Sequence, residues 1–254
     1  MRVVIKVGTS TLAYATCNLN IRKVESLCKV LSDIKNAGHE VILVSSGAIA
    51  MGVGKLRLGK RPDDIPTKQA AASVGQCELM YTYDELFTKH NHTVGQILLT
   101  SSDIDHDDRR QNFVNTMSRL LELGVIPIIN ENDSITTDEI VIGDNDTLAS
   151  IVAVNIDADL LILLSDIDGL FDSDPHVNKN AKLISEVRNL TSEIMALGGN
   201  SLSGLGTGGM ATKLRAAKNC TENGTDMVIA NGENPEILYD IVNGEKIGTR
   251  FFAK

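Results

Sequence analysis

Two lysines of the sequence stand beside glycine and hydroxyl residues, a combination that can bind phosphate. Lys6 lies near the end of an apolar segment and is followed by Gly8, Thr9 and Ser10. A lysine in a buried strand is costly unless it is paired, so one interpretation of Lys6 is a side chain that reaches solvent from a strand edge. The other is a phosphate site, in which the backbone amides and hydroxyl groups of the following turn face the phosphate oxygens.

The densest glycine cluster of the chain lies at residues 203–209 and leads into a helical pattern that contains Lys213. Glycines before a helix N-terminus suit an anion. The cluster does not follow the Walker pattern, because Met210 comes where that pattern has its lysine. It does satisfy Gly-x-Gly-x-x-Gly, but no strand precedes it as a dinucleotide fold requires, which disfavours a nicotinamide dehydrogenase. A flexible loop without a ligand is the structural alternative.

Acidic and amide residues form clusters in two successive loops. Residues 130–133 read Asn-Glu-Asn-Asp after an apolar segment, and residues 143–146 read Gly-Asp-Asn-Asp at the start of a helical pattern. Acidic residues at a helix start are good caps, so a purely structural role for Asp144 is an open alternative. The aspartates at 103–108 resemble the start of a calcium loop but lack its glycine and its final glutamate, and we interpret them as a solvated cap.

The composition argues against several classes of protein. The chain has 254 residues and a formal net charge of −9, and no basic run exceeds two residues, which argues against nucleic acid and anionic membranes as partners. No apolar run approaches the ~18 residues of a membrane span, and the N-terminal apolar stretch is too short for a signal peptide, so we expect a cytoplasmic protein. Its four cysteines and five histidines show no metal-ligand spacing.

Short β-branched segments alternate with helical patterns along the whole chain. This alternation predicts a mainly parallel sheet with helices on both faces and a site beyond the carboxyl ends of the strands. The predicted strands are Val3–Val7, Glu40–Ser45, Thr93–Leu99, Val125–Ile129, Leu160–Leu164, Met227–Ala230 and Ile247–Phe252. The predicted helices are Ile21–Ala37, Thr67–Lys89, Arg109–Leu123, Asp144–Asn155 and Met210–Asn223.

Taken in order, these motifs resemble the glutamate 5-kinases, a branch of the amino-acid kinase family. The stretch at 168–175 is similar to the broader family, whereas Gly-Thr-Ser at 8–10, Asn-Glu-Asn-Asp at 130–133 and Gly-Thr-Gly-Gly-Met at 206–210 are typical of this branch. Acetylglutamate, uridylate and carbamate kinases typically carry Gly-Gly or Ser-Gly after the first lysine, and they are the alternatives within the family. The resemblance covers the whole chain and rests on residues 6–10, 45–48, 129–133, 143–146, 168–175 and 206–213.

The sequence departs from the pattern of this branch in small ways. Ser45 and Phe171 stand where Thr and Tyr are common. Many bacterial members carry a C-terminal PUA domain, and we expect none here.

The resemblance implies a fold and an activity. The implied fold is a three-layer α/β/α sandwich around an open, mainly parallel sheet. It forms one amino-acid kinase domain over residues 1–254, with the amino-acid lobe at about 1–155 and the ATP lobe at about 156–254. The implied reaction is the ATP-dependent phosphorylation of the γ-carboxylate of L-glutamate to L-glutamyl 5-phosphate, the first step of proline biosynthesis. It implies ATP and Mg²⁺ as cofactors, proline as a feedback inhibitor and assembly into a homo-oligomer.

The resemblance also assigns residues to roles. Lys6 and Lys213 would contact the transferring phosphates, and Asp146 would hold the two lysines in place. It names no protein ligand for Mg²⁺. The substrate-binding residues would be Ser46, Asp133 and Asn145. The ATP-binding residues would be Lys6, Gly8, Thr9, Ser10, Ser165, Asp166, Thr207, Gly208, Gly209, Met210, Ala211, Thr212 and Lys213.

The chemistry agrees with these residue types. A glutamate side chain titrates near ~4.3, so its carboxylate is already a nucleophile at neutral pH and needs no catalytic base. What remains is alignment of donor and acceptor and neutralisation of charge on the γ-phosphoryl oxygens. A non-catalytic ligand sensor on the same fold is the competing hypothesis, but a sensor could lose either lysine or Asp146 without penalty.

Overall fold

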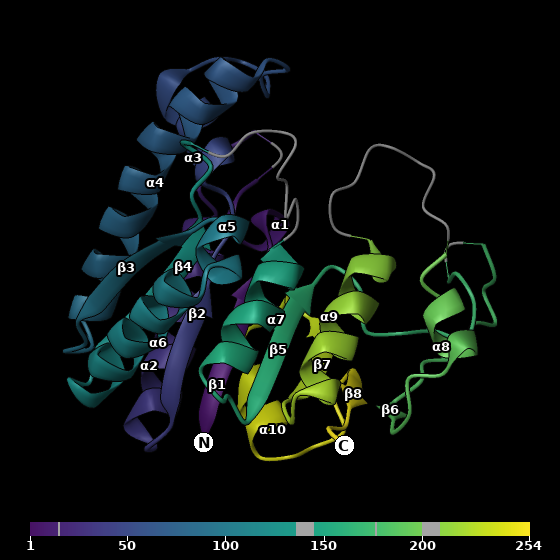
Figure 1. Ribbon diagram of the computed structural model, residues 1–254. Coiled ribbons are helices and arrows are strands. Elements are labelled where there is room, and N and C mark those ends of the chain that lie inside the picture. The colour runs from purple at the N-terminus through teal and green to yellow at the C-terminus, as the bar shows by residue number, and fades with distance from the viewer. Residues whose placement is uncertain (15, 136–144, 176, 200–208) are drawn as a thin grey trace.

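The computed structural model describes residues 1–14, 16–135, 145–175, 177–199 and 209–254. Their strands form one eight-stranded sheet in the order β3-β4-β2-β1-β5-β7-β8-β6 (Figure 1). Neighbouring strands pair in parallel, except for the antiparallel pair β7 and β8. The strands are β1 (Arg2–Val7), β2 (Glu40–Val44), β3 (Val94–Leu99), β4 (Ile126–Glu131), β5 (Leu160–Ser165), β6 (Glu186–Val187), β7 (Asp226–Asn231) and β8 (Thr249–Phe251).

Helices cover both faces of this sheet. One apolar core lies between the sheet and α2, α4 and α10, and a second lies between the sheet and α6, α7 and α9. The predicted three-layer α/β/α fold is thereby confirmed. The helices are α1 (Thr9–Leu12), α2 (Ile21–Asn36), α3 (Ala48–Leu56), α4 (Ile65–Thr88), α5 (Ser101–Asp105), α6 (Asp107–Glu122), α7 (Asn145–Asn155), α8 (Ser192–Ala196), α9 (Met210–Glu222) and α10 (Ile237–Val242).

The central strand β1 shows why its residues form a buried parallel strand. Successive side chains of a strand point to opposite faces of the sheet. Val3 and Ile5 belong to the core under α2 and α4, whereas Val4 belongs to the core under α7 and α9. Lys6 therefore points to the α7 and α9 face, two residues beyond Val4. It lies close to the carboxyl end of β1, where Val44 of β2 and Leu163 of β5 are its partners in the register.

Helices α3 and α4 approach each other at backbone distance. A Cβ atom on Gly75 would lie 1.8 Å from the carbonyl oxygen of Ala48, and one on Gly52 would lie 1.8 Å from that of Ala71. Only glycine fits at either position. This contact fixes the N-terminus of α3, which follows β2 through a turn with Gly47 at φ +95°. The sequence analysis missed α3 because Ala48–Leu56 is apolar on most sides and contains two glycines, which hides a helical period.

Other elements differ from their predicted bounds. The last strand is shorter than predicted and begins at Thr249, after Gly248 at φ +67°. Helix α4 begins at Ile65, where Asp64 caps it by accepting a hydrogen bond from the Thr67 amide at 2.9 Å. The short elements α1, α5, β6, α8 and α10 were not predicted, because segments this brief show no clear period.

The division of the chain into an amino-acid lobe and an ATP lobe stays a prediction. Across the described ranges, no helix is long and apolar enough to span a membrane.

Candidate active site

A buried carboxylate joins two lysines at the carboxyl edge of the sheet. Asp146, in the first turn of α7, is fully buried. Its Oδ1 lies 2.6 Å from Nζ of Lys6 on β1, and its Oδ2 accepts a hydrogen bond of 2.9 Å from Nζ of Lys213 on α9. Both lysines are more than nine-tenths buried. The three residues predicted to form the catalytic centre therefore meet in space.

The local sequence explains how each element delivers its side chain. Lys213 lies on the buried stripe of α9 with Ala217 and Cys220, at helical spacing, so its stem packs toward the sheet. Asp146 lies on the buried stripe of α7 with Ala149. Small alanines on both stripes let α7 and α9 pack side by side on the sheet (Figure 1).

The electrostatics of this cluster favour an anion. Burial would raise the pKa of Asp146, but the ammonium groups of Lys6 and Lys213 outweigh it and hold the pKa below its usual range. The carboxylate therefore stays charged. Within this group of three side chains, one negative charge against two positive charges leaves a net positive charge, which a phosphoryl group can neutralise.

Several residues predicted to bind ATP lie in the turn after Lys6 and just before the helix that carries Lys213. A Cβ on Gly8 would lie 3.8 Å from Nζ of Lys6, so the turn after β1 passes beside that ammonium group. Thr9 and Ser10 begin α1 and are exposed. Gly209, before α9, has open space where a side chain would be.

The first turn of α9 also supports the cluster. Its Thr212 hydroxyl lies 2.6 Å from the Gly209 carbonyl oxygen and 3.4 Å from Oδ2 of Asp146, and it can donate to either. The predicted contacts Met210 and Ala211 lie in the same turn. Thr207 and Gly208 lie outside the described residues, as do Gly143 and Asp144.

Ser165, the last residue of β5, and Asp166, which follows it, are also predicted to bind ATP and lie at the same edge of the sheet. Ser165 comes directly after Leu164, the register partner of Val7. Its hydroxyl donates to Asp166 at 3.1 Å, and its carbonyl oxygen accepts from the Gly232 amide at 2.7 Å. The second of these bonds joins the end of β5 to the loop after β7.

The structure brings together two of the three residues predicted to bind the amino acid. Nδ2 of Asn145 donates to the carbonyl oxygen of Ser45 at 2.6 Å and to Oγ of Ser46 at 2.7 Å. It also lies 3.1 Å from Oδ1 of Asn130, at the end of β4. Because Asn145 precedes Asp146, this polar cluster directly adjoins the two lysines.

The third residue, Asp133, lies in the turn after β4. Within the described part of the chain, no hydrogen bond joins it to Ser46 or Asn145. Burial raises the pKa of Asp133, and the positive charge of Arg61 partly opposes that rise. Burial and the charge of Asp133 raise the pKa of Glu131 to about 7. A cationic group of a ligand beside these two carboxyl groups would oppose both rises and favour the charged carboxylates.

Gln76 and Tyr83 of this region escaped the sequence analysis, which assigned no role to Asn130 or Ser45 either. Asn130 connects Asn145 to Gln76 of α4, and the Tyr83 hydroxyl lies 2.9 Å from Oγ of Ser45. One signal was available: Gln76 is a polar residue on the buried stripe of α4 that includes Ala72, Leu79 and Tyr83.

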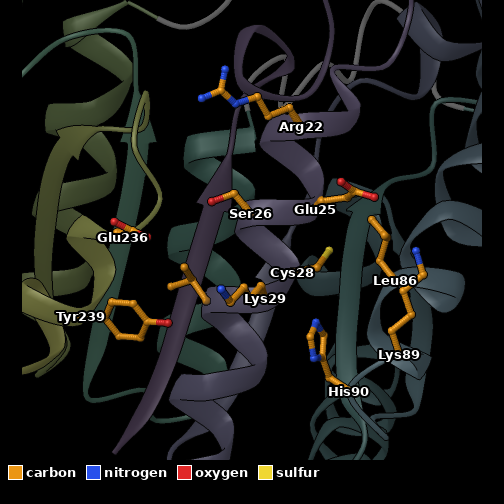
Figure 2. Close-up of a pocket in the computed structure, with 11 residues that line it drawn as sticks. Arg22, Glu25, Ser26, Cys28, Lys29, Leu86, Lys89, His90, Glu236 and Tyr239 are labelled. Atoms are coloured by element: carbon orange, nitrogen blue, oxygen red, sulfur yellow. The ribbon is translucent and has the colours of Figure 1, made fainter.

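A separate pocket of about 390 Å³ lies between α2, the C-terminal end of α4 and the start of α10. Figure 2 shows that α2 contributes charged side chains of both signs, among them Arg22, Glu25 and Lys29. This pocket shares no residue with the predicted site, so the lysine cluster is the better candidate for the chemistry.

No three His, Cys, Asp or Glu side chains gather into a metal site among the described residues. These described residues therefore name no protein ligand for Mg²⁺, and the proposed mechanism has no step through a metal ion.

Comparison with known proteins decides which family carries this arrangement. The model of the amino acid kinase family matches residues 1–231. The glutamate 5-kinase of Clostridium perfringens is 54% identical over 257 residues, which cover 100% of this chain and 96% of that protein. The glutamate 5-kinase of Clostridium acetobutylicum is 56% identical over 253 residues, which cover 100% of this chain and 95% of that protein. The chain belongs to the glutamate 5-kinase branch of the amino acid kinase family.

Solved structures agree with the amino acid kinase fold at low sequence identity. A carbamate kinase from Giardia lamblia bound to AMP-PNP superposes with a TM-score of 0.70 at 20% identity, covering 100% of this chain and 98% of that one. A UMP kinase from Ureaplasma parvum superposes with a TM-score of 0.68 at 15% identity, covering 99% of this chain and 98% of that one. At these identities the likeness concerns the fold alone.

Proposed function

We propose that this chain transfers the γ-phosphoryl group of ATP to the γ-carboxylate of L-glutamate and forms L-glutamyl 5-phosphate, the first step of proline biosynthesis. The observation that carries the proposal is the pairing of Lys6 and Lys213 on the buried carboxylate of Asp146. The identity to glutamate 5-kinases over the whole chain supports glutamate as the acceptor.

The reaction needs no base from the protein. The γ-carboxylate of glutamate titrates near ~4.3 and is ionised at neutral pH. One of its oxygens attacks the γ-phosphorus; an O–P bond forms, the bond from the γ-phosphorus to the β,γ-bridging oxygen breaks, and ADP leaves with the electron pair. No proton has to move in this step.

The lysines supply the main electrostatic contribution. Negative charge spreads over the γ-phosphoryl oxygens in the transition state, and fixed cations at that position stabilise it most where water is excluded. Asp146 acts through the lysines, since its two oxygens hold Nζ of Lys6 and of Lys213 at 2.6 and 2.9 Å. We propose that ATP lies along Gly8, Thr9 and Ser10, beside Ser165 and Asp166, and against Thr207, Gly208, Gly209 and the first turn of α9.

The amino acid then lies on the Asn145 side of the lysines. The hydroxyl of Ser46 accepts from Asn145, which leaves its own proton to donate to a carboxylate oxygen of glutamate. Asp133 is the proposed partner of the α-ammonium group.

From the resemblance we also propose that the protein is cytoplasmic, assembles into a homo-oligomer and binds proline. Sedimentation velocity of the pure protein tests the assembly.

One experiment tests the activity. The pure protein is incubated with Mg-ATP and L-glutamate, L-aspartate, N-acetyl-L-glutamate or UMP, and acyl phosphates are trapped with hydroxylamine while ADP release is measured. We expect hydroxamate with glutamate and strong preference over the other acceptors. Hydroxamate from aspartate or N-acetylglutamate but not from glutamate, or ADP release with UMP alone, would sink the assignment.

A further inference from the structure

Gln76 of α4 carries a buried donor group that no other described residue accepts from. Its side chain is more than nine-tenths buried, and its Oε1 accepts a hydrogen bond of 2.9 Å from Nδ2 of Asn130. Its Nε2 is buried and has no hydrogen-bond partner in the part of the chain that the structure describes. Native proteins satisfy nearly all buried polar groups, so this amide donor calls for an acceptor beyond the described residues, which a bound ligand can supply.

The orientation of this amide follows from a backbone group. Oδ1 of Asn130 accepts from the backbone amide of Glu131 at 2.9 Å, and a backbone N–H can only donate. The Asn130 side chain is therefore fixed with Nδ2 toward Gln76. Turning Gln76 over would place two N–H₂ groups against each other, so Oε1 must face Asn130 and both donors of Nε2 must face away.

The contacts around Gln76 place it at the amino-acid side of the candidate site. Through Asn130 it joins Asn145, the residue that holds Ser46. One turn earlier on α4, the Ser73 hydroxyl donates to Oγ of Ser134 at 2.9 Å. Ser134 directly follows Asp133, so this face of α4 contacts both parts of the proposed glutamate site.

The order of these contacts also indicates which end of glutamate lies near Gln76. The γ-carboxylate must reach the lysines held by Asp146. From there the chain of contacts runs through Asn145 and Asn130 to Gln76, away from the transferring phosphate. An acceptor at this far end is the α-carboxylate.

We propose that Nε2 of Gln76 donates a hydrogen bond to the α-carboxylate of the amino-acid substrate, a role that rests on the proposed function. A donor amide recognises an oxygen acceptor and does not add charge to the site. The competing explanation is that Gln76 only holds Asn130 in place.

Two variants separate these explanations. Gln76→Glu keeps an oxygen for Asn130 and replaces the N–H₂ donor with an oxygen that repels a carboxylate. Gln76→Met removes both bonds at similar volume. Ser32→Ala is the control, because Ser32 is a buried polar residue of α2 whose hydroxyl donates to the Cys28 carbonyl oxygen, away from the site. The glutamate KM and kcat are measured with saturating Mg-ATP, and glutamate binding is measured by calorimetry.

We expect both Gln76 variants to raise the glutamate KM and Kd about ten- to a hundred-fold, the range for a hydrogen bond to a charged group. The kcat at saturating glutamate and the KM for ATP should stay within about threefold, because the contact is made equally before and during transfer. Ser32→Ala should leave the glutamate KM unchanged. A Gln76→Glu enzyme with a wild-type KM would overturn the proposal and leave Gln76 as a residue that positions Asn130.

A measurement on the unmodified chain covers the case in which the variants fold poorly. In wild type, the side-chain amide protons of Gln76 should shift and exchange more slowly with solvent when glutamate is added, and not with Mg-ATP alone. If glutamate is phosphorylated but leaves these protons unchanged, the inference about Gln76 fails while the proposed function stands. If glutamate neither binds nor reacts, the proposed function itself fails.

Discussion

Replacing Asp146 by Asn should destabilise the protein more than any exposed charge change, because it removes the negative charge that two buried lysines share. Asp146 is fully buried, and its oxygens lie 2.6 and 2.9 Å from the two ammonium nitrogens. Asn keeps the shape but removes the charge. Breaking a buried ion pair from one side costs about 3–5 kcal/mol, since the remaining charge is left without compensation. Here two charges remain, so we expect a loss at the upper end of that range.

The control is an ion pair of similar length in solvent. Arg119 and Glu122 of α6 lie 2.8 Å apart, with both side chains more than half exposed. Exposed pairs contribute less than about 1 kcal/mol, so Glu122→Gln should change the free energy of unfolding by less than that. The assay is reversible urea unfolding of wild type and both variants near pH 7.5. Saturating Mg-ATP should recover part of the Asp146→Asn loss, because the phosphates supply negative charge to the same lysines.

The pH dependence follows from the lowered pKa of Asp146. A carboxyl group whose pKa is lower in the folded state stabilises the protein above its unfolded pKa of about 3.9, and that contribution is lost as the pH falls through the folded value. The difference in the free energy of unfolding between wild type and Asp146→Asn should thus have its full size at neutral pH and shrink below about pH 4. A loss at pH 7.5 no larger than that of Glu122→Gln would refute the view that Asp146 balances two buried charges.

Three further predictions concern the same site. Lys6→Ala and Lys213→Ala should each lower kcat about 10²–10³-fold with a much smaller change in the glutamate KM, as steady-state kinetics can show; turnover within a few-fold of wild type would remove that lysine from the mechanism. Asp133→Ala should raise the glutamate KM and the proline inhibition constant together, by about ten- to a hundred-fold, and unchanged proline inhibition would place proline at another site. Burial raises the pKa of Glu131 to about 7, so its ionisation should lower the free energy of unfolding of wild type between pH 5 and pH 8. Urea unfolding at each pH should show a smaller decrease for Glu131→Gln, and an equal decrease in both proteins would contradict this prediction.

The sequence by itself determined most of the sheet and the residue types of the proposed catalytic centre. The apolar runs that became β1, β2, β4, β5 and β7 are buried on both faces, and such runs are recognisable because burial of a whole strand leaves no polar period. Lys6 and the glycines before Lys213 were visible for the same local reason, since a cation in an apolar strand and glycines before a helix are both unusual. Their roles came from the resemblance to a family, and the meeting of Lys6, Asp146 and Lys213 agrees with it.

Only the tertiary structure decided which groups complete the site. Asn145 bonds to the Ser45 carbonyl oxygen across 100 positions, and Asn130 bonds to Gln76 across 54 positions. Nothing in the local pattern around Gln76 says which acceptor its amide meets, because hydrogen-bond pairing depends on how α4 is placed against the sheet. That placement depends in turn on Gly75 and Gly52, where a single Cβ would separate α3 from α4. The hydrophobic period of the sequence indicates whether a residue faces the core. The hydrogen-bond partner that the residue has there depends on the packing of segments far apart in the chain.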